Sequence, residues 1–375
     1  MIIGIPKERR AGELRVAASP DTAKRFVGQG HTVVVERSAG TGAAYTDDAY
    51  AASGAQLGDA AAALGAEIVL KVQRPTADEL KTMKSGAVLV AMLAPLQHKD
   101  DVQAYAKAGV TAFAMELVPR ITRAQTMDVL SSQANLAGYK AVLDAADYFG
   151  RAMPMMMTAA GTVPPARVLV MGAGVAGLQA IATARRLGGV VSATDVRFAA
   201  KEQVESLGAT FLTVDLEAMK AMETAGGYAK EASEDFTRRQ REHVTEALKK
   251  TDIVICTALI PGRKAPILIT KEMVGVMRAG SVIVDLAVEQ GGNVEGSKPD
   301  ETVTTANGVA IIGHSNMPAR IAVDASALYA RNLFAFLGLI VGKDKALKID
   351  EADEIVKASL LTRDGKVVHP QLAGA

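Results

Sequence analysis

Three glycines with the spacing G-x-G-x-x-G form a pattern that can bind a pyrophosphate. Gly172, Gly174 and Gly177 follow an apolar run of strand type and open a helical stretch. The first glycine allows a tight turn, the second lets the backbone approach phosphate groups, and the third permits close packing of helix on strand. Free N–H groups at the helix N-terminus favour an anion. The alternative is a glycine turn that only packs.

An acidic residue accompanies the glycine turn. Asp195 ends the next apolar run, 18 residues after Gly177. A carboxylate at the end of the second strand accepts hydrogen bonds from the adenosine ribose and repels a 2′-phosphate, so it favours NAD over NADP. Arg197 lies two residues further on and weakens this preference slightly. The two features together predict an NAD site.

Side chains for acid–base chemistry are scarce. The five histidines are scattered, and only His314, which follows a strand-like run, is expected near a site. No histidine pair has metal-ligand spacing and Cys256 is the single cysteine, so no metal site is expected. A reaction that moves a proton with a hydride needs a positioned acid or base, often His. The sequence therefore indicates nucleotide binding without evident acid–base groups.

A polar segment, "PRITRAQTMDVLSSQANLAGY" (119–139), lies between a strand-like run and a helical stretch, 136–151, that we expect to link two domains. Composition alone would also fit a solvated loop. The position favours a binding role, because nucleotides bind beyond the strand ends of open α/β sheets. An amide ring and a ribose need both donors and acceptors, and both kinds are supplied by Arg120, Gln125, Asp128 and Ser131.

The elements that must position these groups alternate between strand and helix. Strands are expected at 1–6, 31–36, 66–72, 87–93 and 110–117, and in a second series at 167–171, 190–196, 210–215, 252–259, 281–288 and 309–314. Alternation of Val/Ile/Leu-rich strands with helices predicts parallel sheets covered on both faces. The expected fold is α/β, with two doubly wound parallel-sheet Rossmann-like domains and a cleft between them.

The domain boundaries follow from these two series. We expect an N-terminal domain of residues 1–130 completed by 305–375, and an NAD(H)-binding domain of residues 131–304. The run 309–314 and the apolar helix 324–341 are expected to return to the first domain, because neither has an obvious partner in the second. The Met-, Pro- and Gly-rich stretch 154–166 is expected to be poor helix and poor strand.

Composition limits the function classes. The 375 residues are 49% apolar and 22% charged, enough for two buried cores. A net charge of +1 without a basic block argues against nucleic acid. The single cysteine fits a reducing compartment, and the longest apolar runs fall short of the roughly 20 residues of a membrane helix. We expect a soluble chain, which could still dock onto a membrane partner.

With these features the chain resembles the NAD(H)-binding first domain of proton-translocating NAD(P) transhydrogenases, in the form where this domain is a separate alpha subunit. The resemblance covers almost the whole chain. It is carried by the polar segment, the glycine turn, "ATDVR", "ETAGGYAKE", "TALIPG" and "VIVDLAVEQGGN". Alanine dehydrogenases share the same fold family.

The resemblance implies a set of site residues. The nicotinamide and its ribose would face Arg120, Gln125, Asp128 and Ser131 as catalytic residues. The pyrophosphate would lie on Gly172, Ala173, Gly174, Val175, Ala176 and Gly177, and the adenosine end on Asp195, Val196 and Arg197. Gly227, Gln240 and Leu259 would line the cleft, and Tyr228 would lie near the tip of a flexible loop, 225–236, that closes over NAD(H).

The alanine dehydrogenase pattern is only partly kept. Its two residues for the substrate carboxylate match Arg15 and Lys71, but its catalytic His position falls near Met92 and its catalytic Asp position on Glu289. The substrate chemistry therefore looks dismantled. We expect Arg15 and Lys71 to be structural ion-pair residues.

The resemblance implies an NAD(H)-binding transhydrogenase subunit that takes part in direct hydride transfer to or from NADP(H) on a partner domain. Membrane subunits would couple this transfer to proton translocation. The subunit would be a homodimer, cytoplasmic and peripheral on the inner face of the membrane. Two alternatives stay open: a self-contained alanine dehydrogenase-like NAD-dependent oxidoreductase, and an NAD-binding module or sensor without catalysis.

Overall fold

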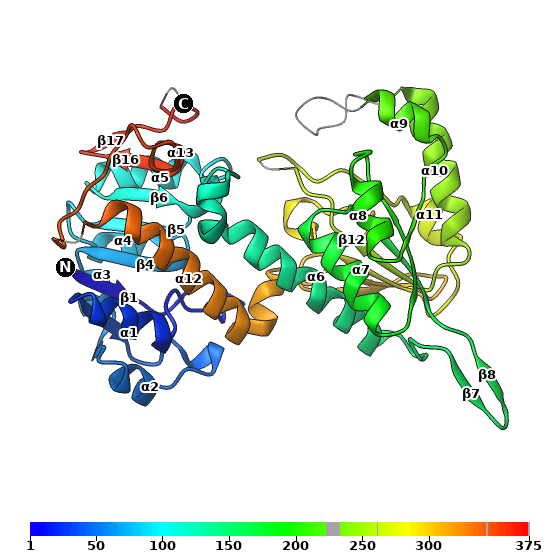
Figure 1. Ribbon diagram of the computed structural model, residues 1–375, viewed down its shortest axis with the longest axis horizontal. Coiled ribbons are helices and arrows are strands. Elements are labelled where there is room, and N and C mark those ends of the chain that lie inside the picture. Colours follow the sequence, from blue (N-terminus) through cyan, green and yellow to red (C-terminus); the bar gives the residue numbers. More distant parts are fainter. Residues whose placement is uncertain (223–232, 261, 343, 374–375) are drawn as a thin grey trace. The chain divides into compact units, whose positions relative to one another are not determined.

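The computed structural model describes residues 1–222, 233–260, 262–342 and 344–373 (Figure 1). The chain divides into two compact units, Met1–Gln133 with Pro318–Ala375, and Ala134–Met317. The boundary falls inside helix α6 (Val129–Tyr148). Each unit has its own sheet and its own buried cores.

The sheet of the first unit is mainly parallel. Its parallel strands lie in the order β6-β5-β4-β1-β2-β3, so the order reverses between β1 and β4, as in a doubly wound sheet. The strands are β1 (Ile2–Ile5), β2 (Thr32–Glu36), β3 (Gln56–Gly58), β4 (Ile68–Gln73), β5 (Val88–Met92) and β6 (Thr111–Ala114), extended by the antiparallel β16 (Leu360–Arg363) and β17 (Lys366–Val367). The helices are α1 (Pro20–Gly28), α2 (Asp47–Ala52), α3 (Ala60–Leu64), α4 (Ala77–Thr82), α5 (Lys99–Lys107), α12 (Ala322–Ile340) and α13 (Glu354–Ser359), with 3₁₀ helices η1 (Thr41–Ala43), η2 (Met115–Leu117), η3 (Thr122–Met127) and, at the boundary, η5 (Met317–Ile321).

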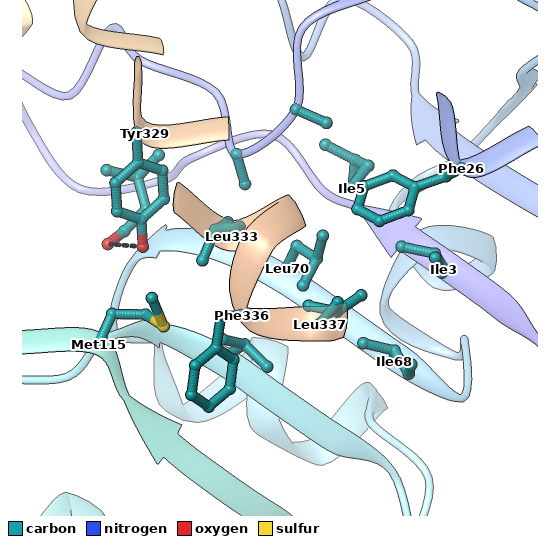
Figure 2. Close-up of a cluster of buried hydrophobic side chains, with 14 of the residues drawn as sticks. Ile3, Ile5, Phe26, Ile68, Leu70, Met115, Tyr329, Leu333, Phe336 and Leu337 are labelled. Carbon is teal, nitrogen blue, oxygen red and sulfur yellow. Dashed lines mark hydrogen bonds between the residues drawn. The ribbon is translucent and has the colours of Figure 1, made fainter. Parts of the chain in front are cut away.

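Helix α12 forms part of the first unit's core. Its side chains Leu333 and Phe336 are completely buried and pack in one cluster with Ile5 and Leu70 of the sheet (Figure 2). The hydroxyl of Tyr329, also on α12, donates to the Lys71 carbonyl at 2.8 Å. Among the described residues, one helical stretch, Met317–Ile340, is long and apolar enough to cross a membrane, but half of its apolar window is buried inside the protein. These contacts make α12 a core helix of this unit.

The second unit repeats the doubly wound order. Its parallel strands lie in the order β11-β10-β9-β12-β13-β15, followed by an antiparallel edge strand, β14. The strands are β9 (Arg167–Met171), β10 (Val190–Thr194), β11 (Thr210–Phe211), β12 (Ile253–Cys256), β13 (Val282–Asp285), β14 (Thr302–Thr304) and β15 (Ala310–Ile312). The helices are α7 (Val175–Arg186), α8 (Ala200–Ser206), α9 (Leu216–Met222), α10 (Glu234–Leu248) and α11 (Lys271–Gly275), with the 3₁₀ helix η4 (Val288–Gln290). The prediction of two doubly wound parallel sheets is confirmed.

Two sequence predictions are wrong. The run 309–314 stays in the second unit, because β15 pairs in parallel with β13 through Val282–Ala310 and Ile283–Ile311. The chain returns to the first unit only at Pro318, not at residue 305.

The second wrong prediction concerns residues 154–166. They contain an antiparallel hairpin of β7 (Met156–Thr158) and β8 (Gly161–Val163), which extends away from the sheet of its unit (Figure 1). Its methionines Met155, Met156 and Met157 are exposed. The hairpin could not be predicted because the stretch has neither strand alternation nor β-branched residues before the end of its first strand.

Candidate functional site

The glycine turn joins β9 to α7, at the carboxyl end of the strand where the order of the sheet reverses. Gly172 has φ +97°, and a Cβ there would lie 2.7 Å from Thr257 Oγ1. A Cβ on Gly177 would lie 1.8 Å from the Gly172 carbonyl oxygen, so only glycine fits. A Cβ on Gly174 would meet no protein atom within 4 Å. The backbone of Gly174 is therefore open to a ligand, as pyrophosphate binding requires.

Asp195 follows β10 and contacts the glycine turn directly. Its carboxylate accepts hydrogen bonds from Ala173 N at 2.7 Å, from Arg197 N at 2.8 Å and from Arg197 Nε at 2.9 Å. Burial by itself would raise the pKa of this carboxyl, but the bonds from Arg197 and Ala173 outweigh burial and lower the pKa below its ordinary value. Asp195 is thus ionised at neutral pH and is partly neutralised by Arg197.

Two residues missed by sequence reasoning support the same edge of the sheet. Thr257, after β12, donates from its hydroxyl to the Gly172 carbonyl at 2.9 Å. Asn293 accepts from Ala258 N at 3.0 Å and donates to the Ala258 carbonyl at 2.9 Å. These bonds hold the chain after β12 against the glycine turn. No local motif marks them, because their partners are distant in sequence.

Apolar side chains are exposed around this edge. Val175 opens α7, Val196 follows Asp195, and Leu259 lies beyond β12, with exposed fractions of 36%, 72% and 47%. They follow three neighbouring strands of the sheet, β9, β10 and β12. Apolar surface beside a phosphate-type turn suits a planar base such as adenine. The residues present therefore fit a dinucleotide.

The remaining predicted cleft residues are placed differently. Gln240, on α10, accepts from Val214 N at 3.0 Å and donates to Thr194 Oγ1 at 3.1 Å, so its amide braces the ends of β10 and β11. Ala173 and Ala176 lie in the turn and the first turn of α7. Gly227 and Tyr228, with most of the loop predicted around them, lie outside the described residues.

The predicted catalytic segment lies in the first unit, over η3 and the start of α6. Arg120 and Gln125 are exposed, and their side chains make no hydrogen bond to any residue that the structure describes. Arg123 differs, because its guanidinium binds the Asp353 carboxylate at 2.7 and 3.0 Å. Arg120 and Gln125 are therefore exposed at the surface of the segment, whereas Arg123 is held in an ion pair.

Asp128 and Ser131 form a pair at the start of α6. Asp128 Oδ1 accepts from Ser131 N at 2.8 Å, and Oδ2 accepts from Ser131 Oγ at 2.6 Å. This is a helix-capping arrangement, which satisfies an N–H group that has no partner within the helix. Both side chains are half-buried, so some of their polar surface stays accessible.

The residues matching the alanine dehydrogenase substrate site are engaged inside the first unit. Arg15 Nη2 lies 2.6 Å from Glu13 Oε2, and Lys71 Nζ lies 2.8 Å from Glu79 Oε1 and 3.2 Å from Glu8 Oε2. Both cationic side chains are almost completely buried. The ion pairs predicted for Arg15 and Lys71 are present.

The two other positions lack the alanine dehydrogenase groups as well. Met92 ends β5, and Glu289 lies in η4, where its Oε2 accepts from Asn316 N at 3.0 Å.

One glycine outside the motif also shapes the site. Gly138, on α6, lies against the start of α7, and a Cβ there would be 2.0 Å from the Ala176 carbonyl oxygen. Close approach of α6 to α7 therefore requires glycine at this position. The sequence "NLAG" carries no signal for this contact.

Comparisons with known proteins agree with this geometry. Residues 4–137 match the family described as "Alanine dehydrogenase/PNT, N-terminal domain", and residues 141–370 match its C-terminal domain. The chain is 59% identical to an NAD(P) transhydrogenase alpha subunit of Rhodospirillum rubrum, over 100% of this chain and 99% of the relative. It is 46% identical to the corresponding subunit of Rickettsia prowazekii, over 97% and 95%.

Among solved structures, a transhydrogenase is more similar to this chain than an alanine dehydrogenase is. The transhydrogenase structure from Sinorhizobium meliloti has a TM-score of 0.90 at 53% identity, covering 98% of this chain and 100% of that one. An L-alanine dehydrogenase structure has a TM-score of 0.84 at 28% identity, covering 99% and 98%. The alanine dehydrogenase of Bacillus subtilis is 29% identical over 100% and 94%. The chain therefore belongs to the alanine dehydrogenase/PNT family, on the branch of the NAD(P) transhydrogenase alpha subunits.

Proposed function

We propose that this chain binds NAD(H) at the carboxyl edge of the second unit's sheet. The supporting features are the open Gly174 backbone, the Asp195 carboxylate and the exposed apolar side chains Val175, Val196 and Leu259. N–H groups at the start of α7 suit the pyrophosphate. Asp195 suits the adenosine ribose, and the bound nucleotide is NAD(H) rather than NADP(H).

The reaction is direct hydride transfer between this NAD(H) and NADP(H) bound by a partner domain. NADH supplies a hydride, and no proton accompanies it, so the reaction needs no general acid. Arg120, Gln125, Asp128 and Ser131 hold the nicotinamide and its ribose. Catalysis then consists of orienting the ring and excluding water.

The observation that carries this proposal is the contrast between two polar sets in the first unit. Arg15 and Lys71 are buried and saturated by Glu13, Glu8 and Glu79. The polar segment instead presents Arg120 and Gln125 on the surface. The two residues that match an amino-acid site are therefore engaged in internal ion pairs. The polar segment, in contrast, has exposed groups that suit a nucleotide.

The proposal includes partners. Membrane subunits of the transhydrogenase hold the NADP(H)-binding domain and couple hydride transfer to proton translocation, so this chain is peripheral on the cytoplasmic face of the membrane. The chain is a homodimer. The hairpin β7–β8 supports this, because Met155 and Met157 are 60% and 80% exposed on a projecting element, and apolar groups gathered on a surface mark an interface.

One assay tests the function. The complete chain is mixed with NADPH and with an NAD analogue whose reduced form absorbs at a different wavelength, in the presence or absence of the NADP(H)-binding partner subunit. We expect reduction of the analogue by NADPH only when the partner is present. NAD reduction by alanine without a partner would instead establish an alanine dehydrogenase-like enzyme, and NADH binding without either activity would establish a binding module.

A further inference from the structure

Asn332 is a buried amide on the core helix α12, 7% exposed. Its Nδ2 donates to the Thr126 carbonyl at 2.8 Å, and its Oδ1 accepts from Ser132 Oγ at 2.8 Å. A carbonyl can only accept, so the Thr126 contact fixes the orientation of the amide and leaves Oδ1 facing the Ser132 hydroxyl. One side chain thus binds both ends of residues 126–132.

The stretch between these two contacts carries several groups of the proposed nicotinamide site. Gln125 directly precedes Thr126, and Asp128 and Ser131 lie inside the stretch. Asp128 and Ser131 brace each other through bonds of 2.8 and 2.6 Å, but this bond pair is local and does not fix the turn against the rest of the first unit. The Asn332 amide adds a polar link from this turn to α12, beside Met127 and Val129, which pack in the same buried cluster as α12.

A purely structural explanation accounts poorly for an amide at this position. The neighbouring Leu333 and Phe336 of α12 are apolar and completely buried. A polar group among them carries a desolvation cost that only its hydrogen bonds offset. Both of these partners of Asn332 belong to the segment of the site, so the bonds act on that segment.

We propose that Asn332 is a positioning residue for hydride transfer, which clamps Thr126 and Ser132 so that Gln125, Asp128 and Ser131 are held ready for the nicotinamide. This proposal rests on the proposed function of the polar segment. Asn332 affects the reaction through geometry, because a small displacement of the reacting nicotinamide ring lowers the transfer rate by a large factor. NADH affinity, which depends mainly on the second unit, is little affected.

The test compares Asn332→Leu and Asn332→Asp with wild type. Leucine is similar in size to asparagine and removes both hydrogen bonds. Aspartate keeps an acceptor for Ser132 but loses the donor to Thr126. Single-turnover hydride transfer is measured with the complete chain and the NADPH-loaded partner subunit, and NADH affinity is measured by fluorescence titration. We expect Asn332→Leu to slow transfer at least about tenfold, with NADH affinity changed less than about threefold.

The matched control is Thr362→Val. Thr362 is also buried in the first unit and makes two such bonds, from Ala112 N at 3.1 Å and to the Val110 carbonyl at 2.7 Å. The Asn332→Leu and Thr362→Val proteins are both assayed well below their measured melting temperatures. Thr362→Val is expected to lose stability without loss of transfer rate. Equal transfer rates in Thr362→Val and Asn332→Leu would overturn the positioning role.

Further variants test the clamp and the proposed function separately. Ser132→Ala should slow transfer less than Asn332→Leu, and the double variant should be no slower than Asn332→Leu, because the two residues share one contact. Full additivity would contradict the clamp. Gln125→Asn and Asp128→Asn test the proposed function itself: if they keep full transfer, the segment does not hold the nicotinamide and the inference fails with it. If they slow transfer but Asn332→Leu does not, only the inference fails.

Discussion

At the scale of single residues, the proposed preference for NAD(H) depends on the pairing of Asp195 with Arg197. The guanidinium donates to both carboxylate oxygens at 2.9 Å, so this cation beside the proposed adenosine position is held by the acid. Arg197 would suit a 2′-phosphate if it were released from the acid. In the proposed site, the carboxylate would therefore disfavour NADP(H) in two ways, by its own charge and by occupying Arg197.

The variant Asp195→Asn tests this arrangement. NADH affinity should fall roughly 10- to 100-fold, since a hydrogen bond to a charged group contributes about 1.5–3 kcal/mol. NADPH affinity should rise, because the released Arg197 guanidinium can bind the 2′-phosphate. Both affinities are measured by fluorescence titration of the isolated chain.

The matched control is the double variant Asp195→Asn with Arg197→Gln. It lacks the guanidinium and should lose the gain in NADPH affinity while keeping the loss in NADH affinity. If the double variant bound NADPH as well as the single variant does, the gain would not come from Arg197.

Residues in local motifs could be predicted from the sequence, and residues defined by distant contacts could not. Gly172, Gly177 and Asp195 follow a fixed spacing that the turn geometry itself demands. Asn332 binds Thr126, 206 residues away, and Thr257 binds Gly172, 85 residues away. A hydroxyl or amide within an apolar run carries no sign of such a partner.

At the scale of elements, the position of α6 against α7 depends on the absence of one side chain. A Cβ on Gly138 would lie 2.0 Å from the Ala176 carbonyl oxygen, which belongs to the first turn of α7. A backbone carbonyl in a helix cannot move aside as the end of a flexible side chain can. Any larger residue must push α6 away from the end of α7 that is proposed to bind the pyrophosphate.

Gly138→Ala is therefore expected to destabilise the protein by about 1–3 kcal/mol, the usual cost of overpacking. NADH affinity should fall as well, because the start of α7 moves. Gly338→Ala on α12 is the matched control: a Cβ there meets nothing within 4 Å, and alanine should stabilise that helix by about 0.5–1 kcal/mol. Thermal unfolding and NADH titration measure both effects, and equal stability of the two variants would contradict the predicted clash.

Strand and helix alternation could be predicted because each buried parallel strand is a run of Val, Ile and Leu. The pairing of strands was harder to predict. Residues 310–312 have the same apolar character whether they join one sheet or the other, and only the register with Val282 and Ile283 decides between them. Such pairing depends on the loops and on the available edge, which composition does not encode.

At the scale of the whole molecule, two units with separate sheets divide the proposed work between nucleotide binding and nicotinamide positioning. The chain matches its transhydrogenase relative in R. rubrum over 100% of its own length, so both units belong to the shared architecture. The β7–β8 hairpin extends from the second unit, and its exposed methionines would suit a partner surface. A second copy of the chain is the partner that the proposed homodimer supplies.

The proposed role of the β7–β8 hairpin can be tested with charged side chains. Glutamate at positions 156 and 157 (Met156→Glu with Met157→Glu) would place two charges where an interface buries apolar side chains, and charge burial without a partner is strongly unfavourable. We expect the variant to sediment as a monomer at concentrations at which the wild type is a dimer. Ile267→Glu, at a side chain of the same unit that is 40% exposed, is the control and should leave the dimer intact. A methionine variant that still sediments as a dimer would show that the hairpin lies outside the dimer interface.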